Sequence, residues 1–304
     1  MGRSCMTGNW RRNSLVPRSC IALAMFMLIA VPRSGQGADS PAASRGEYLF
    51  HAAGCAGCHT SDNPKGQLLA GGRRLDTPFG AFFPPNITPD PEHGIGRWEF
   101  GDFVRAMREG KGPDGTIYFP AFPYPSYTGM SDADLSDLWV YLKTVPPVAA
   151  PAPGHDLNFP FYIRALVWPW RWLYFNAGEK PVDAARPEPW RRGVYLVRAV
   201  AHCGECHTPR NFLGGPENGR ELAGNPNGPD GKRIPDITPN EKNGIGAWTV
   251  GDIESYLEMG ILPDGDFAGG AMVEVIENST SKMTPEDRKA VATYIKSVPA
   301  SGAP

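Results

Sequence analysis

Apolar residues recur at helical spacing near the end of each half of this sequence. In the first half, one helix face carries Leu135, Leu138, Trp139 and Leu142. This pattern predicts a helix that starts at Ser131, has Asp134 in its first turn and ends at Val145-Pro146-Pro147. In the second half, a helix from Thr284 should bury Val291, Tyr294 and Ile295.

Helix-start and helix-stop signals predict two further pairs of helices. Ser44 and Glu47 form a capping-box pattern that should begin the first helix, and Pro189 suits the first turn of its counterpart. A middle helix should follow Trp98 and stop at Gly110. Its counterpart should follow Trp248 and stop at Gly260.

Several short motifs occur twice, about 150 residues apart. Asn86-Ile-Thr-Pro89 matches Asp236-Ile-Thr-Pro239, and Gly94-Ile-Gly-Arg-Trp98 matches Gly244-Ile-Gly-Ala-Trp248. A duplication of this length predicts two homologous domains, each a small helical bundle. The expected fold is therefore all-α, with two tandem domains in 38–147 and 188–304 joined by a linker in 148–187.

The same repeat contains two Cys-x-x-Cys-His motifs, at Cys55–His59 and Cys203–His207. This pattern is the attachment site of a c-type haem, because two thiols on one turn can reach the two vinyl groups and the histidine can bind the iron. The cofactor-binding residues are then Cys55, Cys58, His59, Cys203, Cys206 and His207. The sequence predicts two covalently attached haems c.

Other chemistries of paired cysteines explain these motifs less well. A thioredoxin-like redox pair or a zinc site needs no histidine directly after the second cysteine in both copies. Two disulfides are another possibility for four cysteines in an exported chain, but it leaves the repeated histidine and the threonine that follows it unexplained.

The first 37 residues resemble a secretory signal peptide. They contain five arginines and no acidic residue, followed by an apolar run of twelve residues from Cys20 to Val31 and then by small and polar residues. We expect cleavage between Gly37 and Ala38, and a periplasmic product. An uncleaved anchor is the alternative.

Charge narrows the range of partners. Without residues 1–37 the chain has 25 Lys and Arg and 32 Asp and Glu, a net charge of −7. A nucleic acid is therefore not expected as a partner. We expect protein redox partners instead.

The linker contains an aromatic stretch in 159–175. Its length would suit a short membrane span, but Arg164, Arg171, Pro160 and Pro169 argue against one. We expect a strap packed across both domains, and peripheral membrane contact is the alternative.

The sequence resembles the multihaem cytochrome c subunits of bacterial quinoprotein alcohol dehydrogenases and related periplasmic dehydrogenases. The residues that carry the resemblance are 118–126, the repeated Ile-Thr-Pro and Gly-Ile-Gly-x-Trp motifs, and the glycine-rich segment 269–280. It covers most of the chain after residue 37, apart from the aromatic stretch. The resemblance implies class I cytochrome c domains and electron transfer from a dehydrogenase toward the respiratory chain. The family members commonly carry three haems, whereas this chain has two motifs.

The proximal iron ligands should be His59 and His207. Each should donate its other ring N–H to a backbone carbonyl that the sequence does not identify. The remaining histidines, His51, His93, His155 and His202, should be structural or exposed.

A distal methionine is the usual second iron ligand in electron-transfer cytochromes. The resemblance favours Met272 for the second haem. For the first haem, Met130 remains after Met107 and His93 are set aside as core and exposed residues. Against Met130, it aligns with Met283, which should pack at a helix start.

These observations predict an electron carrier with no catalytic residues, in the role of the electron-accepting subunit of a dehydrogenase complex. The alternative is a dihaem redox enzyme, peroxidase-like or thiosulfate dehydrogenase-like, with one open haem site.

Overall fold

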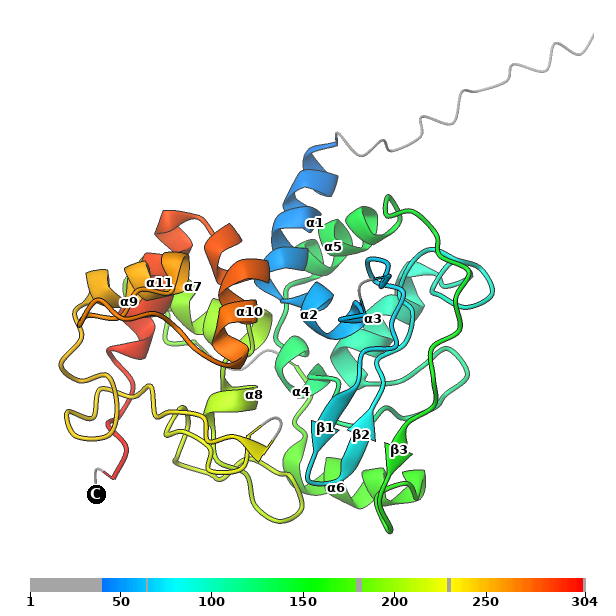
Figure 1. The fold of residues 1–304 in the computed structure, drawn as a ribbon. Coiled ribbons are helices and arrows are strands. Elements are labelled where there is room, and N and C mark those ends of the chain that lie inside the picture. Colours follow the sequence, from blue (N-terminus) through cyan, green and yellow to red (C-terminus); the bar gives the residue numbers. More distant parts are fainter. Residues whose placement is uncertain (1–39, 64, 179–181, 229–230, 303–304) are drawn as a thin grey trace, which may run out of the picture. The chain divides into compact units, whose positions relative to one another are not determined.

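The computed structural model describes residues 40–63, 65–178, 182–228 and 231–302. The signal-peptide prediction and its cleavage site fall outside these residues. The described residues belong to one compact unit. They are rich in helix, with one small sheet (Figure 1).

Five helices lie in the first half of the chain. They are α1 (Pro41–Ala52), α2 (Cys55–His59), α3 (Phe100–Glu109), α4 (Tyr124–Tyr127) and α5 (Asp132–Leu142). The start predicted for the first helix is wrong: Ser44 and Glu47 lie inside α1. Ser40 is the cap instead, because its side chain accepts a hydrogen bond from the Ala43 N–H, and Pro41 suits the first turn.

The second half contains a matching set. It comprises α7 (Glu188–Tyr195), the π-helical turn η2 (Leu196–Val200), α8 (Gly204–His207), α9 (Val250–Met259), α10 (Ala271–Asn278), the 3₁₀ turn η4 (Thr280–Lys282) and α11 (Pro285–Ile295). Pro189 lies in the first turn of α7, as predicted.

The predicted limits of the middle and last helices are confirmed. Gly110 and Gly260 end α3 and α9 in the left-handed conformation, with φ of 59° and 72°. Ser131 and Thr284 cap α5 and α11 with their side chains. The predicted apolar faces are turned inward, with Leu135 and Val291 both almost fully buried.

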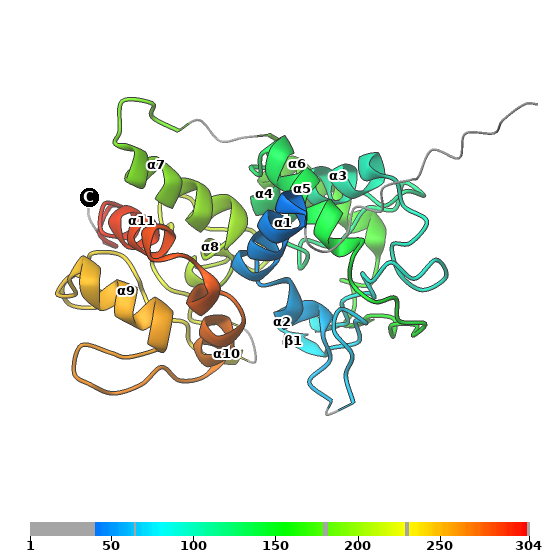
Figure 2. The ribbon, with the colours of Figure 1, turned by 90° about the horizontal axis from the view of Figure 1, so that it is seen from above.

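The first and last helices of each half pack closely, α1 on α5 and α7 on α11 (Figure 2). The contact points are Gly46 and Gly193. A Cβ on Gly46 would lie 2.0 Å from the Asp137 carbonyl oxygen, and one on Gly193 would lie 2.1 Å from that of Ala290. Only glycine allows the backbones to approach this closely.

The expectation of an all-α fold needs a correction. A three-stranded antiparallel sheet contains β1 (Leu75–Thr77), β2 (Gly80–Phe82) and β3 (Asp156–Leu157). The strands have two or three residues each, too few to show the alternation that identifies a strand. β3 comes from the segment predicted as a linker and pairs with β2, on the side away from β1.

The aromatic stretch forms the 3₁₀ turn η1 (Arg164–Leu166) and helix α6 (Val167–Tyr174). It contacts both halves of the chain. Arg171 donates to the Glu109 carbonyl oxygen at 2.6 Å, and the indole N–H of Trp170 donates to that of Leu213 at 3.0 Å. Among the described residues, no helix is both long enough and apolar enough to span a bilayer.

Candidate haem-attachment site

The first Cys-x-x-Cys-His motif forms the short helix α2. Gly54 leads into it in the left-handed conformation, with φ of 63°, which a glycine adopts without strain. Cys55 and Cys58 therefore lie one turn apart, and His59 follows at the end of the same helix.

The second motif has the same layout on α8. Cys203 is the residue before this helix, and Cys206 and His207 are on it. His202 precedes it with φ of 41°, a conformation that is uncommon for a residue with a side chain. The chain thus makes the same sharp turn before both motifs.

Both motif histidines are fixed by a backbone carbonyl. The Nδ1 of His59 lies 2.8 Å from the Pro85 oxygen, and the Nδ1 of His207 lies 2.9 Å from the Pro235 oxygen. A carbonyl oxygen can only accept, so Nδ1 carries the hydrogen in both rings. The lone pair of Nε2 remains for a metal ion, as the sequence predicted.

Burial supports the neutral form of these rings. It lowers the pKa of His59 and of His207 below the ordinary value, although the hydrogen bond to the proline carbonyl acts in the opposite direction. A neutral imidazole with Nδ1–H is the form that ligates iron through Nε2.

The four thiols are free and strongly protonated. Burial raises the pKa of Cys55 and Cys203 to about 12, and it is also the main reason that the Cys206 pKa rises to about 11. A thioredoxin-like nucleophile requires the opposite shift. The structure therefore disfavours the thiol-redox interpretation of the motifs.

The loops behind the motifs repeat one hydrogen-bond pattern. The N–H groups of Leu69 and Leu222 donate to the hydroxyls of Thr60 and Thr208, at 3.2 and 3.1 Å. Both leucines have positive φ, 60° and 64°, and both are fully buried. The threonine after each motif histidine thus fixes the loop beneath it.

The two motifs approach one another. His202, next to Cys203, lies with Nε2 3.2 Å from the Ala53 carbonyl oxygen, two residues before Cys55. Each attachment site is therefore built against the other.

Segments from one half also contact the motif of the other. Helix α10 packs on α2, and Arg73 binds both the Gly57 carbonyl oxygen and the Glu274 carboxylate of α10. In the opposite direction, the Ser126 hydroxyl donates to the Glu205 carboxylate within the second motif, at 2.8 Å.

The two proposed distal methionines lie in different settings. Met130 is fully buried, directly before the cap of α5, and its carbonyl oxygen accepts from Arg108 at 2.6 Å. Met283 holds the equivalent place before α11, where its carbonyl oxygen accepts from Arg288. Met272 lies in the first turn of α10 and is half-buried. The ligand roles of Met130 and Met272 stay predictions.

The other histidines lie outside the two motifs. His51 and His202 face backbone carbonyl oxygens of Asn278 and Ala53, and the Nδ1 of His155 accepts from the Phe83 N–H at 3.1 Å. His93 is partly exposed and directly precedes the turn Gly94-Ile95-Gly96.

Sequence reasoning missed Pro85 and Pro235, the acceptors for the motif histidines. They directly precede the repeated segments Asn86-Ile-Thr-Pro89 and Asp236-Ile-Thr-Pro239, so the repeat extends one residue further toward the N-terminus. Nothing comparable in the sequence indicates the Arg73–Glu274 and Ser126–Glu205 contacts.

These donors fit two covalently attached haems c. Each site offers two free thiols one turn apart and an imidazole whose Nε2 has no hydrogen-bond partner in the described part of the chain. The groups that hold each haem would be Cys55, Cys58 and His59, and Cys203, Cys206 and His207.

Comparisons with known proteins agree with this site. A family model for cytochrome c matches residues 43–146. The chain is 46% identical over 262 residues to a dihaem c-type cytochrome of Cereibacter sphaeroides, covering 85% of this chain and 86% of that protein.

Other similar proteins are subunits of dehydrogenases. The chain is 43% identical over 265 residues to the fructose dehydrogenase cytochrome subunit of Gluconobacter japonicus, covering 86% of this chain and 54% of that protein. It is 36% identical over 274 residues to the cytochrome c subunit of a quinone alcohol dehydrogenase of Gluconobacter oxydans, covering 87% of this chain and 56% of that protein.

Proposed function

Because the chain belongs to the dihaem c-type cytochromes, we propose that it carries electrons from a dehydrogenase toward the respiratory chain in the periplasm. Its relatives include cytochrome subunits of fructose, alcohol and gluconate dehydrogenases. We assign it the same role, as the electron-accepting subunit rather than the catalytic one.

The observation that carries this proposal is the duplicated histidine geometry. His59 and His207 each hold Nδ1–H against a proline carbonyl oxygen and leave Nε2 for iron. A bound haem supplies reversible one-electron chemistry at its iron. The chain's own residues hold the ring by two thiols, orient the imidazole and exclude water from it.

We propose that the chain is organised as a signal peptide in 1–37, a class I cytochrome c domain in 38–147, a linker in 148–187 and a second such domain in 188–304. The match of the cytochrome c family model to residues 43–146 supports the limits of the first cytochrome c domain. The repeated helix order supports the second domain. The linker includes β3 and α6, which also pack on residues of both halves.

We propose Met130 and Met272 as the distal ligands. A methionine thioether bound to the iron would raise its reduction potential and close it to exogenous ligands, as a carrier requires. Met130 is fully buried within the first half of the chain, which supports its assignment to the first haem. Met272 lies in the first turn of α10, in the second half of the chain, and is the position that the resemblance favours for the second haem.

The test is copurification followed by reduction. The tagged full-length protein should copurify with a dehydrogenase, and adding that enzyme's substrate should reduce both haems. Carbon monoxide should bind to little of the reduced protein. A protein that binds carbon monoxide stoichiometrically and by itself turns over peroxide or thiosulfate would instead be the dihaem enzyme.

A further inference from the structure

Large apolar side chains gather on one exposed surface. Sixteen large hydrophobic residues are exposed among the described residues, and nine of them belong to 159–173 or to the adjoining loop 212–213. We call these nine the aromatic face. Its members are Phe159, Tyr162, Ile163, Leu166, Trp168, Trp172, Leu173, Phe212 and Leu213.

The aromatic face is continuous across two segments of the chain. Trp168 and Trp172 lie one turn apart on α6, with exposed fractions of 59% and 84%, so both project from one side of this helix. The loop that carries Phe212 is joined to α6 through Trp170 and through the hydrogen bond from Asn211 to the Tyr174 hydroxyl, 3.1 Å long. Helix α6 lies at the lower edge of the ribbon in Figure 1.

The two arginines of this segment are held by backbone carbonyl oxygens and aromatic rings, while Arg164 remains exposed and Arg171 partly exposed. Arg164 donates to the Ile117 carbonyl oxygen at 2.7 Å and stacks on Phe119. Arg171 donates to the Glu109 carbonyl oxygen and stacks on Tyr124 and Phe175. The other exposed side chains of 164–171 are aromatic or aliphatic.

The charge of this surface differs from that of the rest of the chain. Residues 157–178 contain two arginines and no acidic residue, although the chain after residue 37 carries a net −7. Within the described residues, neither Arg164 nor Arg171 forms an ion pair, so the segment 157–178 keeps the positive charge of its two arginines. A negatively charged surface would complement them.

From this combination we infer that the aromatic face binds the surface of a lipid bilayer containing anionic phospholipids. Trp and Tyr concentrate where hydrocarbon meets headgroups, because their rings are apolar at one end and hydrogen-bond at the other. Exposed Leu and Ile add apolar area, and the arginines attract anionic headgroups.

Cosedimentation with vesicles tests this inference on the full-length, haem-loaded protein. The protein should pellet with vesicles of phosphatidylethanolamine and phosphatidylglycerol, and less with phosphatidylcholine alone. Replacing both tryptophans, Trp168→Ser with Trp172→Ser, should lower the partition coefficient by at least about tenfold, since two exposed indoles no longer insert.

Phe267→Ser is the matched control, since Phe267 is 68% exposed and lies outside the aromatic face. It should change the partition coefficient by less than about twofold. Failure of the unmodified protein to pellet, or equal binding by the double variant, would overturn the inference. If that variant instead lost only its copurifying dehydrogenase, the face would be a protein interface. Reduction of the haems by the dehydrogenase's substrate is measured without vesicles, so the proposed function is tested separately.

Discussion

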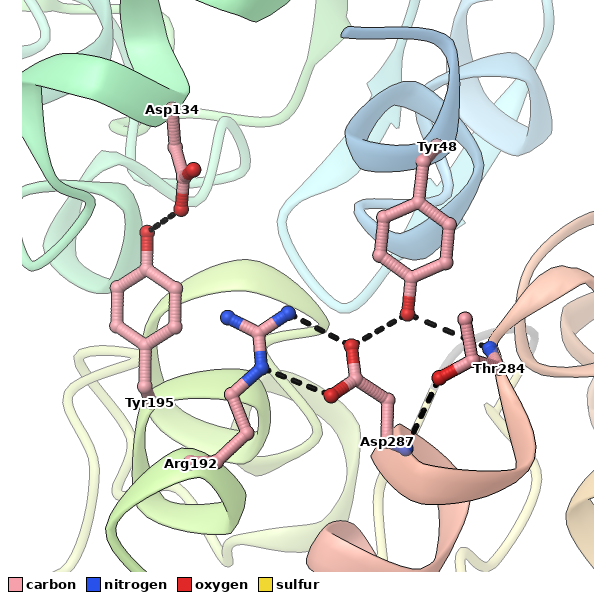
Figure 3. A network of polar contacts seen from close by, with 6 residues as sticks. All are labelled: Tyr48, Asp134, Arg192, Tyr195, Thr284 and Asp287. Carbon is pink, nitrogen blue, oxygen red and sulfur yellow. Dashed lines mark hydrogen bonds and ion pairs between the residues drawn. The ribbon is translucent and has the colours of Figure 1, made fainter. Parts of the chain in front are cut away.

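The phenol of Tyr48 donates a hydrogen bond to the carboxylate of Asp287, 239 residues further along the chain. The same phenol oxygen accepts from the Thr284 N–H at 3.4 Å, so a side chain of α1 meets the first turn of α11 (Figure 3). Arg192 completes this arrangement with two hydrogen bonds to the Asp287 carboxylate, of 2.8 and 2.6 Å.

The opposite half repeats the contact in reverse. The phenol of Tyr195 donates to Asp134, as Figure 3 shows. It also accepts from the Ser131 N–H at 3.2 Å, at the first turn of α5. Each half therefore supplies a tyrosine to the last helix of the other, as in a two-fold symmetric interface. This reciprocity holds the two motif-bearing halves in one compact unit.

The first prediction concerns these tyrosines. Tyr48→Phe and Tyr195→Phe should each lower the free energy of unfolding by roughly 1.5–3 kcal/mol, because each removes a partly buried hydrogen bond to a carboxylate. Denaturant unfolding of the haem-loaded protein measures this change. Tyr162→Phe is the control, since Tyr162 is exposed, and it should leave the stability within about 0.5 kcal/mol of the parent. Equal stability of all three variants would show that these two tyrosine contacts do not stabilise the fold.

Acid should act on the same contact. Burial pulls the pKa of Asp287 upward, but hydrogen bonds from Arg192 and Tyr48 outweigh it and hold the pKa below the ordinary 3.8. A lowered folded-state pKa contributes stability that is fully present above the unfolded value and is lost as the pH falls through the folded value. Stability should therefore decline as the pH falls below about 4.

Asp287→Asn should flatten this acid limb, whereas Glu241→Gln, at an exposed position, should keep it. Unfolding curves recorded across the acid range check both variants. An acid limb of unchanged slope in Asp287→Asn would mean that other carboxylates cause it.

The helix crossings give a third prediction. Gly46→Ala and Gly193→Ala would place a methyl group about 2 Å from a backbone oxygen, and backbone cannot move aside as a flexible side chain can. Each should destabilise the protein by about 3 kcal/mol or more. Gly101→Ala in α3, whose new Cβ would lie 3.8 Å from the end of the Arg105 side chain, should be neutral or stabilising by up to about 1 kcal/mol. Similar thermal midpoints for all three variants would contradict the close approach.

The distal ligands can be tested one haem at a time. Met130→Leu should convert one haem to a high-spin spectrum and leave the other unchanged, because leucine keeps the volume and removes the sulfur. Met272→Leu should do the same to the other haem. Met283→Leu is the control for Met130, since both occupy the position before a helix cap, and it should leave both spectra as they were. A low-spin, methionine-ligated spectrum in Met130→Leu would exclude this residue.

Local signals in the sequence were sufficient for much of the fold. Ser131 and Thr284 begin helices and Gly110 and Gly260 end them, because capping depends on residues within one turn. The attachment motifs are equally local. In contrast, the start of α1 was misplaced, because Ser44 also fits a capping pattern but Ser40 is followed by proline.

Contacts between distant segments could not be read from the sequence. The Tyr48–Asp287 pair spans 239 residues, and neither residue type signals a partner. The strands of the small sheet are too short to show a period. Pro85 and Pro235 contribute only carbonyl oxygens to the site, and a backbone group has no signature in the residue type.

The most direct test of the account is the mass of the purified chain under denaturing conditions, followed by mass mapping of its peptides. We predict the polypeptide plus two haems, one on the peptide that contains Cys55 and Cys58 and one on the peptide that contains Cys203 and Cys206. A mass with one haem or none, or both haems lost on denaturation, would contradict the claim that each motif holds a haem covalently.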